Sequence, residues 1–181
     1  MGNRAHVIFH NEKDNEISPA VYLHWNGGPA SVYSFLDELE RRKVRNDVKY
    51  GPARFAGIVM EFFDSEKYTK LSREWFAPKW RGGLSVLGVT NGPEEITPAA
   101  LEPFNHGDNG VYVVATDNGT QRMTNHGTQR MRRFMGYPLD ELSPEDVARE
   151  ESTARKDFYM CPENGIPSVY DKTKPIEGEG K

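Results

Sequence analysis

The sequence has little of what marks a secreted or membrane protein. It contains one cysteine, Cys161, among 181 residues, so no intramolecular disulfide can form. It lacks the apolar run of about 18 residues that a membrane-spanning helix needs. Its first residues show no basic segment followed by an apolar one, which would mark a secretory leader. These absences predict a cytoplasmic protein that does not associate with a membrane.

An excess of one charge is also missing. The net charge is −4 at pH 7, whereas dedicated nucleic-acid-binding proteins are usually strongly basic, so bulk charge identifies no partner. The hydrophobic share of 36% is enough for the core of one ordinary domain. We therefore expect a single domain over residues 3–158. A flexible or surface-laid tail should cover residues 159–181, where proline and glycine are frequent and apolar residues are few.

Complete signatures of common enzyme sites are absent as well. Ser85 lies in Gly-Leu-Ser-Val-Leu, which lacks the second glycine of a nucleophile elbow. Gly27 and Gly28 precede an expected helix, but the spacing of dinucleotide-binding and P-loop motifs is missing. Cys161 has no cysteine or histidine at the spacing of a zinc ribbon. We therefore expect no enzyme activity and no cofactor.

The clearest pattern that is present is a period-two alternation over residues 5–10 and again over residues 20–25. It predicts a β-hairpin with a long loop. The predicted core face consists of Val7, Phe9, Val21, Leu23 and Trp25. The opposite face carries His6, His10, Tyr22 and His24.

Helix signals follow the hairpin. Apolar residues at helical spacing predict a helix over residues 30–43 and a second from near Asp47 or Pro52 to Phe63. Ser143 and Pro144 begin a last helix over residues 144–156. Further strands are predicted over residues 84–90 and 111–116. The fold class is therefore α+β, with a mostly antiparallel sheet, two N-terminal helices packed on one face and a C-terminal helix.

The strongest candidate for partner binding is a segment in which aromatic and basic residues alternate. Its residues are Tyr68, Trp75, Phe76, Trp80 and Arg81. Such side chains concentrate binding energy at protein interfaces, and they can also stack on single-stranded nucleic acid. The alternative interpretation is that the aromatic side chains close one end of the core.

A second basic patch lies at an internal duplication, in which residues 118–123 are repeated almost unchanged at 126–131. The duplication predicts the tip of an elongated hairpin or a meander. The patch consists of Arg122, Arg130, Arg132 and Arg133. These arginines either contact phosphates or form a solvated charged face.

Three histidines on the hairpin allow one further interpretation. His6, His10 and His24 project from the same predicted face, and three imidazoles with one open position would suit zinc. The alternative is that they are ordinary surface residues, and we assign no residue of this chain as a metal ligand. A small metal-dependent hydrolase is the third functional hypothesis.

The segment His24-Trp25-Asn26-Gly27-Gly28-Pro29 after the hairpin resembles small uncharacterised phage and plasmid proteins with a His-Trp-(Asp/Asn)-Gly-x-Pro motif. The resemblance covers about the first forty residues and implies a mobile genetic element, but no catalytic residues. It also implies a protein that inhibits a host complex, such as a CRISPR or restriction effector. We therefore expect a non-enzymatic anti-defence protein, for example an anti-CRISPR, whose partner is a host protein or ribonucleoprotein. The first alternative is a nucleic-acid-associated protein with an aromatic and basic surface.

Overall fold

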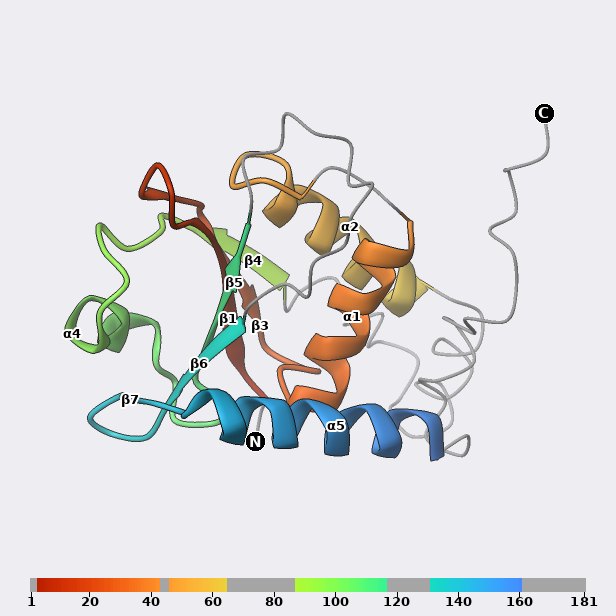
Figure 1. The fold of residues 1–181 in the computed structure, drawn as a ribbon. Helices are drawn as coiled ribbons and strands as arrows, with labels where there is room; N and C mark the ends of the chain where they lie inside the picture. Colours follow the sequence, from red (N-terminus) through yellow and green to blue (C-terminus); the bar gives the residue numbers. More distant parts are fainter. Residues whose placement is uncertain (1–2, 43–45, 65–86, 117–130, 161–181) are drawn as a thin grey trace.

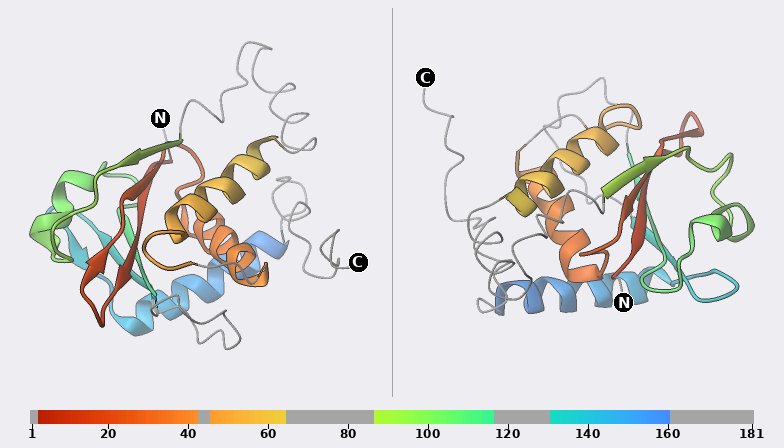
Figure 2. Two further views of the ribbon diagram at one scale, coloured as in Figure 1. Left: turned by 90° about the horizontal axis from the view of Figure 1, so that it is seen from above. Right: turned by 180° about the vertical axis from the view of Figure 1, so that it is seen from behind.

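The computed structural model describes residues 3–42, 46–64, 87–116 and 131–160. A twisted sheet separates a layer of three longer helices from a short helix on the other side (Figures 1 and 2). The strands are β1 (Ala5–Asn11), β2 (Glu16–Ile17), β3 (Ala20–Leu23), β4 (Leu87–Thr90), β5 (Val111–Ala115), β6 (Met131–Met135) and β7 (Asp140–Glu141). The helices are α1 (Pro29–Arg41), α2 (Gly51–Asp64), α4 (Pro98–Leu101), the 3-10 turn η2 (Glu102–Phe104) and α5 (Pro144–Met160).

The strands form one sheet in the order β4-β3-β1-β5-β6-β7, with β2 paired to the end of β1. β1 and β5 are parallel, whereas each of the other pairs is antiparallel. The predicted α+β class with a mostly antiparallel sheet is therefore confirmed. The helices differ in detail from the prediction, because α4 and η2, between β4 and β5, are additional to the three predicted helices.

The predicted hairpin forms the centre of the sheet. Its register pairs Ala5 with Leu23, His6 with Tyr22 and Val7 with Val21. Because side chains alternate along a strand, the odd-numbered residues of both strands point to one face. On that face, a core cluster joins the strands to residues of α1 and α2, and Trp25 packs against it partly buried. The predicted core face is confirmed.

Short-range signals position the two helices over this face. Gly28 precedes α1 in an extended conformation and Pro29 is its first residue, where a proline costs no hydrogen bond. The Asp47 carboxylate accepts from the backbone N–H groups of Lys49 and Tyr50 just before α2 begins. Arg42 then joins the two helices, because its guanidinium contacts Glu38 and Glu61, each at 2.6 Å.

The opposite face of the sheet is also covered, contrary to the expectation of a polar surface. The strand residues Ile8, Ala20, Val111, Val113 and Phe134 form a second core cluster with Leu101 and Leu139, and Ile17, Ile96 and Phe104 pack against it. As a result, His6 and His10 are only 4% and 7% exposed. The expectation failed because the alternation of β1 showed its two faces but not the later segment that covers one of them.

The last helix begins at Pro144, as predicted, and runs to Met160, beyond the predicted start of the tail at residue 159. It lies beside α1 (Figure 1). Residues 161–181, and all of the duplication except Met131 at the start of β6, lie outside the described residues. Across the described ranges, the helices are too short or too polar to cross a bilayer.

Candidate functional site

A cluster of imidazole and aromatic rings lies at one end of the sheet, on the side that faces α4. His6 belongs to β1, Tyr22 is its direct partner on β3, and His106 lies in the loop between η2 and β5. The His6 ring centroid is 5.1 Å from those of Tyr22 and His106, and it stacks on His106 at an interplanar angle of 30°. His24, which follows β3, completes the group that we call the ring cluster: His6, Tyr22, His24, Phe104 and His106.

His6 is the buried centre of the ring cluster. Its Nδ1 lies 2.8 Å from the carbonyl oxygen of Phe104 and must donate to it, because a carbonyl only accepts. Burial, with a smaller contribution from nearby His106, lowers the pKa of His6 from 6.5 to about 4. The ring is therefore neutral at pH 7 and has its proton on Nδ1.

An ion pair borders the cluster on its solvent side. The Arg4 side chain donates through Nε to Asp108 Oδ2 at 2.8 Å and through Nη2 to the carbonyl of His106 at 2.9 Å. The hydrogen bond from Arg4 lowers the pKa of Asp108. Partial burial and the nearby Arg4 charge lower the pKa of His106, which keeps this ring neutral as well.

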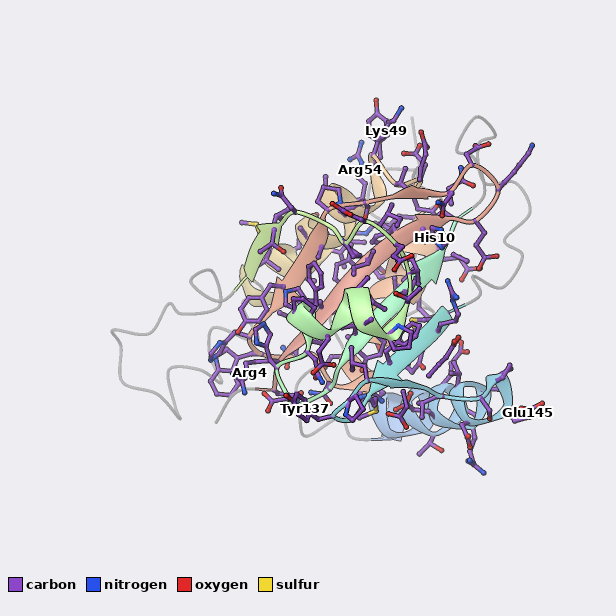
Figure 3. All side chains as sticks on the ribbon, turned by 90° about the vertical axis from the view of Figure 1, so that its left-hand side faces the viewer. Arg4, His10, Lys49, Arg54, Tyr137 and Glu145 are labelled. Atoms are coloured by element: carbon purple, nitrogen blue, oxygen red, sulfur yellow. The ribbon has the colours of Figure 1, made fainter. Side chains whose placement is uncertain are left out.

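The outer part of the cluster is accessible to a partner. Tyr22 and His24 are half-buried and joined by a 2.9 Å hydrogen bond between the Tyr22 hydroxyl and His24 Nδ1, and His106 is exposed. Asn105 donates to the carbonyl of Gly136, which ties the loop to the turn that carries Tyr137, 90% exposed. Arg4 and Tyr137 lie at the same end of the molecule in Figure 3. We call Tyr22, His24, His106 and Tyr137 the ring surface.

The ring surface offers aromatic ring faces and imidazole nitrogens, and its neighbouring cation is already paired. Such groups can stack and form hydrogen bonds with a partner. They do not form a metal centre: in the described part of the chain, no three His, Cys, Asp or Glu side chains converge as metal ligands. His6 and His10 are four residues apart on one extended strand, about 13 Å, too far for both to bind one zinc ion. The predicted arrangement of His6, His10 and His24 around zinc is therefore not present.

The predicted partner-binding segment cannot be placed. Tyr68, Trp75, Phe76, Trp80 and Arg81 all lie in residues 65–86, outside the described residues. Of the second basic patch, Arg122 and Arg130 also lie outside them. Arg132 is on β6, with its side chain 33% exposed, and it lies 3.8 Å from Glu12 and 3.9 Å from Glu141. Its charge is therefore partly balanced.

Arg133 is not a surface residue, which corrects the prediction for this position. It is 2% exposed and lies over the ring of Tyr112, with its guanidinium carbon 4.8 Å from the ring centroid. Its Nε donates to the carbonyl of Asn109 at 3.0 Å, and its Nη1 forms an ion pair with Glu150 of α5. The alternation of β6 turns Arg132 and Arg133 to opposite faces, and α5 covers the second.

Sequence reasoning identified the hairpin members of the ring cluster but missed Arg4, His106 and Asp108. The only signal for the last two was the turn-forming run from Asn105 to Gly110, which contains two glycines and two asparagines. That run predicts a loop, but the parallel pairing of β5 with β1 is what brings the loop over His6. No protein-family model matches this chain, and comparison with the curated proteins and with the solved structures finds no match.

Proposed function

We propose that this chain is a non-enzymatic binding protein of a phage or plasmid. It acts in the cytoplasm by docking on a host protein or ribonucleoprotein complex, such as a CRISPR or restriction effector, and inhibiting it. The observation that carries the proposal is the ring surface, which gathers two tyrosines and two histidines with accessible rings at one end of the sheet. The mobile-element setting is supported by the motif that includes His24 and Trp25.

The chemistry of the ring surface favours a protein partner over nucleic acid. Tyrosine rings carry much of the binding energy in protein interfaces, because they bury a large area at little cost in side-chain entropy. Nucleic-acid binding depends instead on unpaired cations that neutralise phosphates. Here Arg4 is engaged by Asp108 at 2.8 Å, and the chain as a whole carries a net charge of −4.

The test begins with capture of a partner and then compares variants in the purified complex. The tagged chain is used to capture proteins from lysates of relevant bacterial hosts, and captured proteins are identified by mass spectrometry. With the purified partner at pH 7.5, we expect Tyr137→Ala and His106→Ala each to weaken binding at least tenfold. Tyr50→Ala is the matched control, since Tyr50 is 44% exposed. Its sequence neighbours Lys49 and Arg54 lie at the end of the molecule opposite Arg4 and Tyr137 in Figure 3.

The same assay tests the aromatic segment. If it contributes to the interface, Trp75→Ala or Trp80→Ala weakens binding by about 2 kcal/mol and leaves the melting temperature unchanged, whereas Lys67→Ala costs far less. A large fall in melting temperature instead assigns the two tryptophans to the core. Failure to capture any specific partner, or binding only to nucleic acid with a steep salt dependence, would contradict the proposed function.

A further inference from the structure

Residues 104–108, which we call the strap, cover His6 and close the ring cluster. Hydrogen bonds fasten the strap to His6 of β1 and to Arg4, including one from the Arg4 backbone N–H to Asp108 at 3.0 Å. His6 Nδ1 donates to the Phe104 carbonyl at 2.8 Å, Arg4 Nη2 to the His106 carbonyl at 2.9 Å, and Arg4 Nε to Asp108 at 2.8 Å. The strap is therefore held on the side of β1 by the neutral His6 imidazole and by Arg4, and Asn105 ties it to the carbonyl of Gly136.

Fixed points border the strap on both sides. Leu101 before it is fully buried in the second core cluster. Asn109 after it donates to the Arg4 carbonyl and accepts from Arg133, both at 3.0 Å. Gly107 and Gly110 have φ angles of +72°, a conformation that glycine adopts without strain. The strap can thus open between its two ends while the sheet stays intact.

While the strap is closed, the groups beside His6 do not offset the positive charge that a second proton on its ring would bring. The titratable groups that contact the His6 ring are Tyr22 from β3 and His106 of the strap, and the residue beside it on β5 is Val111. Arg4, His24 and Asp108 lie one contact further out: His24 bonds to Tyr22, and Arg4 bonds to the His106 carbonyl and to Asp108. Asp108 is already engaged by Arg4, and His106 stacks directly on the ring. An imidazolium in this position would be buried beside a second imidazole.

We propose that the strap is an acid-released latch, which is closed while His6 is neutral and opens when His6 takes up a proton and needs contact with water. Opening also removes His106 from its place beside Tyr22, and so dismantles part of the ring surface. This consequence for partner docking rests on the proposed function, whereas the opening itself does not.

The expected size of the response follows from proton linkage. Burial and the nearby His106 hold the pKa of His6 at about 4 in the closed form, against the ordinary value of 6.5 for a hydrated imidazole. The ratio of open to closed molecules then rises about 30-fold between pH 7.5 and pH 5, and about 150-fold by pH 4. Above about pH 7 the ratio stays constant.

The experiment measures hydrogen exchange of the full chain without any partner, at pH 7.5 and pH 5, corrected for the intrinsic exchange rates. We expect peptides that cover the strap to lose protection about 30-fold at pH 5, while β1 and β5 remain protected. His6→Phe keeps a ring but cannot take up a proton, so its strap exchange should not depend on pH. His10→Asn is the matched control, since His10 is buried on the same face of β1 away from the strap.

Two further variants decide the cause of opening even if His6→Phe does not fold. His106→Gln, at an exposed position, removes the neighbouring imidazole, so a proton on His6 costs less in the closed form and the loss of protection at pH 5 should be smaller. Asp108→Asn should loosen the strap at pH 7.5 but keep the acid response. An acid response that is lost in Asp108→Asn, unaltered in His106→Gln or absent from the unmodified chain would overturn the latch. Partner affinity at pH 7.5 tests the proposed function separately.

Discussion

At the scale of single residues, Arg133 joins three elements through one buried charge. It connects β6 to the turn at Asn109 and to Glu150 of α5, which also accepts from Tyr33 of α1 at 3.3 Å. Burial lowers the pKa of Arg133. The charge remains in the interior because its hydrogen bonds and its ion partner offset the loss of water.

Arg133→Met should therefore lower the free energy of unfolding by about 3 kcal/mol, because it removes the cation that pairs with Glu150 and the donor to the Asn109 carbonyl. Urea denaturation at pH 7 measures the change. Arg132→Met, one residue earlier on the outer face, is the control and should cost less than about 1 kcal/mol. Equal losses in the two variants would show that burial of Arg133 is unimportant.

Two adjacent glycines of the hairpin-to-helix junction differ sharply in their surroundings. A Cβ on Gly27 would lie 2.7 Å from backbone atoms of Asn3, Arg4 and Ala5, whereas one on Gly28 would meet side-chain atoms, of Asn3 at 3.4 Å and of Asn109 at 3.8 Å. Backbone atoms cannot yield as a side chain can. Gly27→Ala should thus destabilise the protein by about 2 kcal/mol or more, and Gly28→Ala by less than about 1 kcal/mol, in thermal unfolding. A larger loss of stability in Gly28→Ala than in Gly27→Ala would contradict the close approach of the Asn3–Ala5 backbone to Gly27.

At the scale of elements, His6 makes the contact between β1 and the strap depend on pH. Its folded-state pKa of about 4 lies below the ordinary 6.5, so the unfolded chain binds the proton more readily. Stability is therefore complete above about pH 6.5, decreases as the pH falls from 6.5 to 4, and is level below that range. The decrease should be on the order of 2 kcal/mol in urea denaturation.

Two variants identify the group that causes the stability to decrease between pH 6.5 and pH 4. His6→Phe should flatten stability between pH 6.5 and pH 4, whatever it does to stability at pH 7. Asp108 acts in a different window, because the hydrogen bond from Arg4 lowers its pKa and the stability it contributes is lost only at still lower pH. Asp108→Asn should keep the slope between pH 6.5 and pH 4, and a flat profile there would assign the effect to the carboxylate.

The elements also differ in how well they could be predicted. The hairpin and α1 were predictable because alternation, Gly28 and Pro29 act within a few residues of the structure they cause. The start of α2 was uncertain, and the structure places Asp47 in a turn before a helix that begins at Gly51. The strap could not be recognised, because its role depends on contacts with Arg4 and His6, about 100 residues away in sequence.

At the scale of the whole molecule, the pairing of distant strands was beyond sequence reasoning. Local periodicity shows that residues 5–11 and 111–115 form strands, but it does not show that they are neighbours or parallel. That one pairing carries α4 and the strap over the second face, and it determines which histidines are buried. The predicted zinc arrangement and the predicted exposed patch at Arg133 both failed for lack of such long-range information.

The central position of β1 has a consequence for synthesis on the ribosome. β1 and β3 can pair early, but the other edge of β1 has no neighbour until Val111–Ala115 has been made, about 100 residues later. During that interval the nascent hairpin presents open backbone hydrogen-bonding groups and an apolar face, which are the features that chaperones bind and that aggregation begins from. The last strands to leave the ribosome therefore complete a sheet that the first residues began.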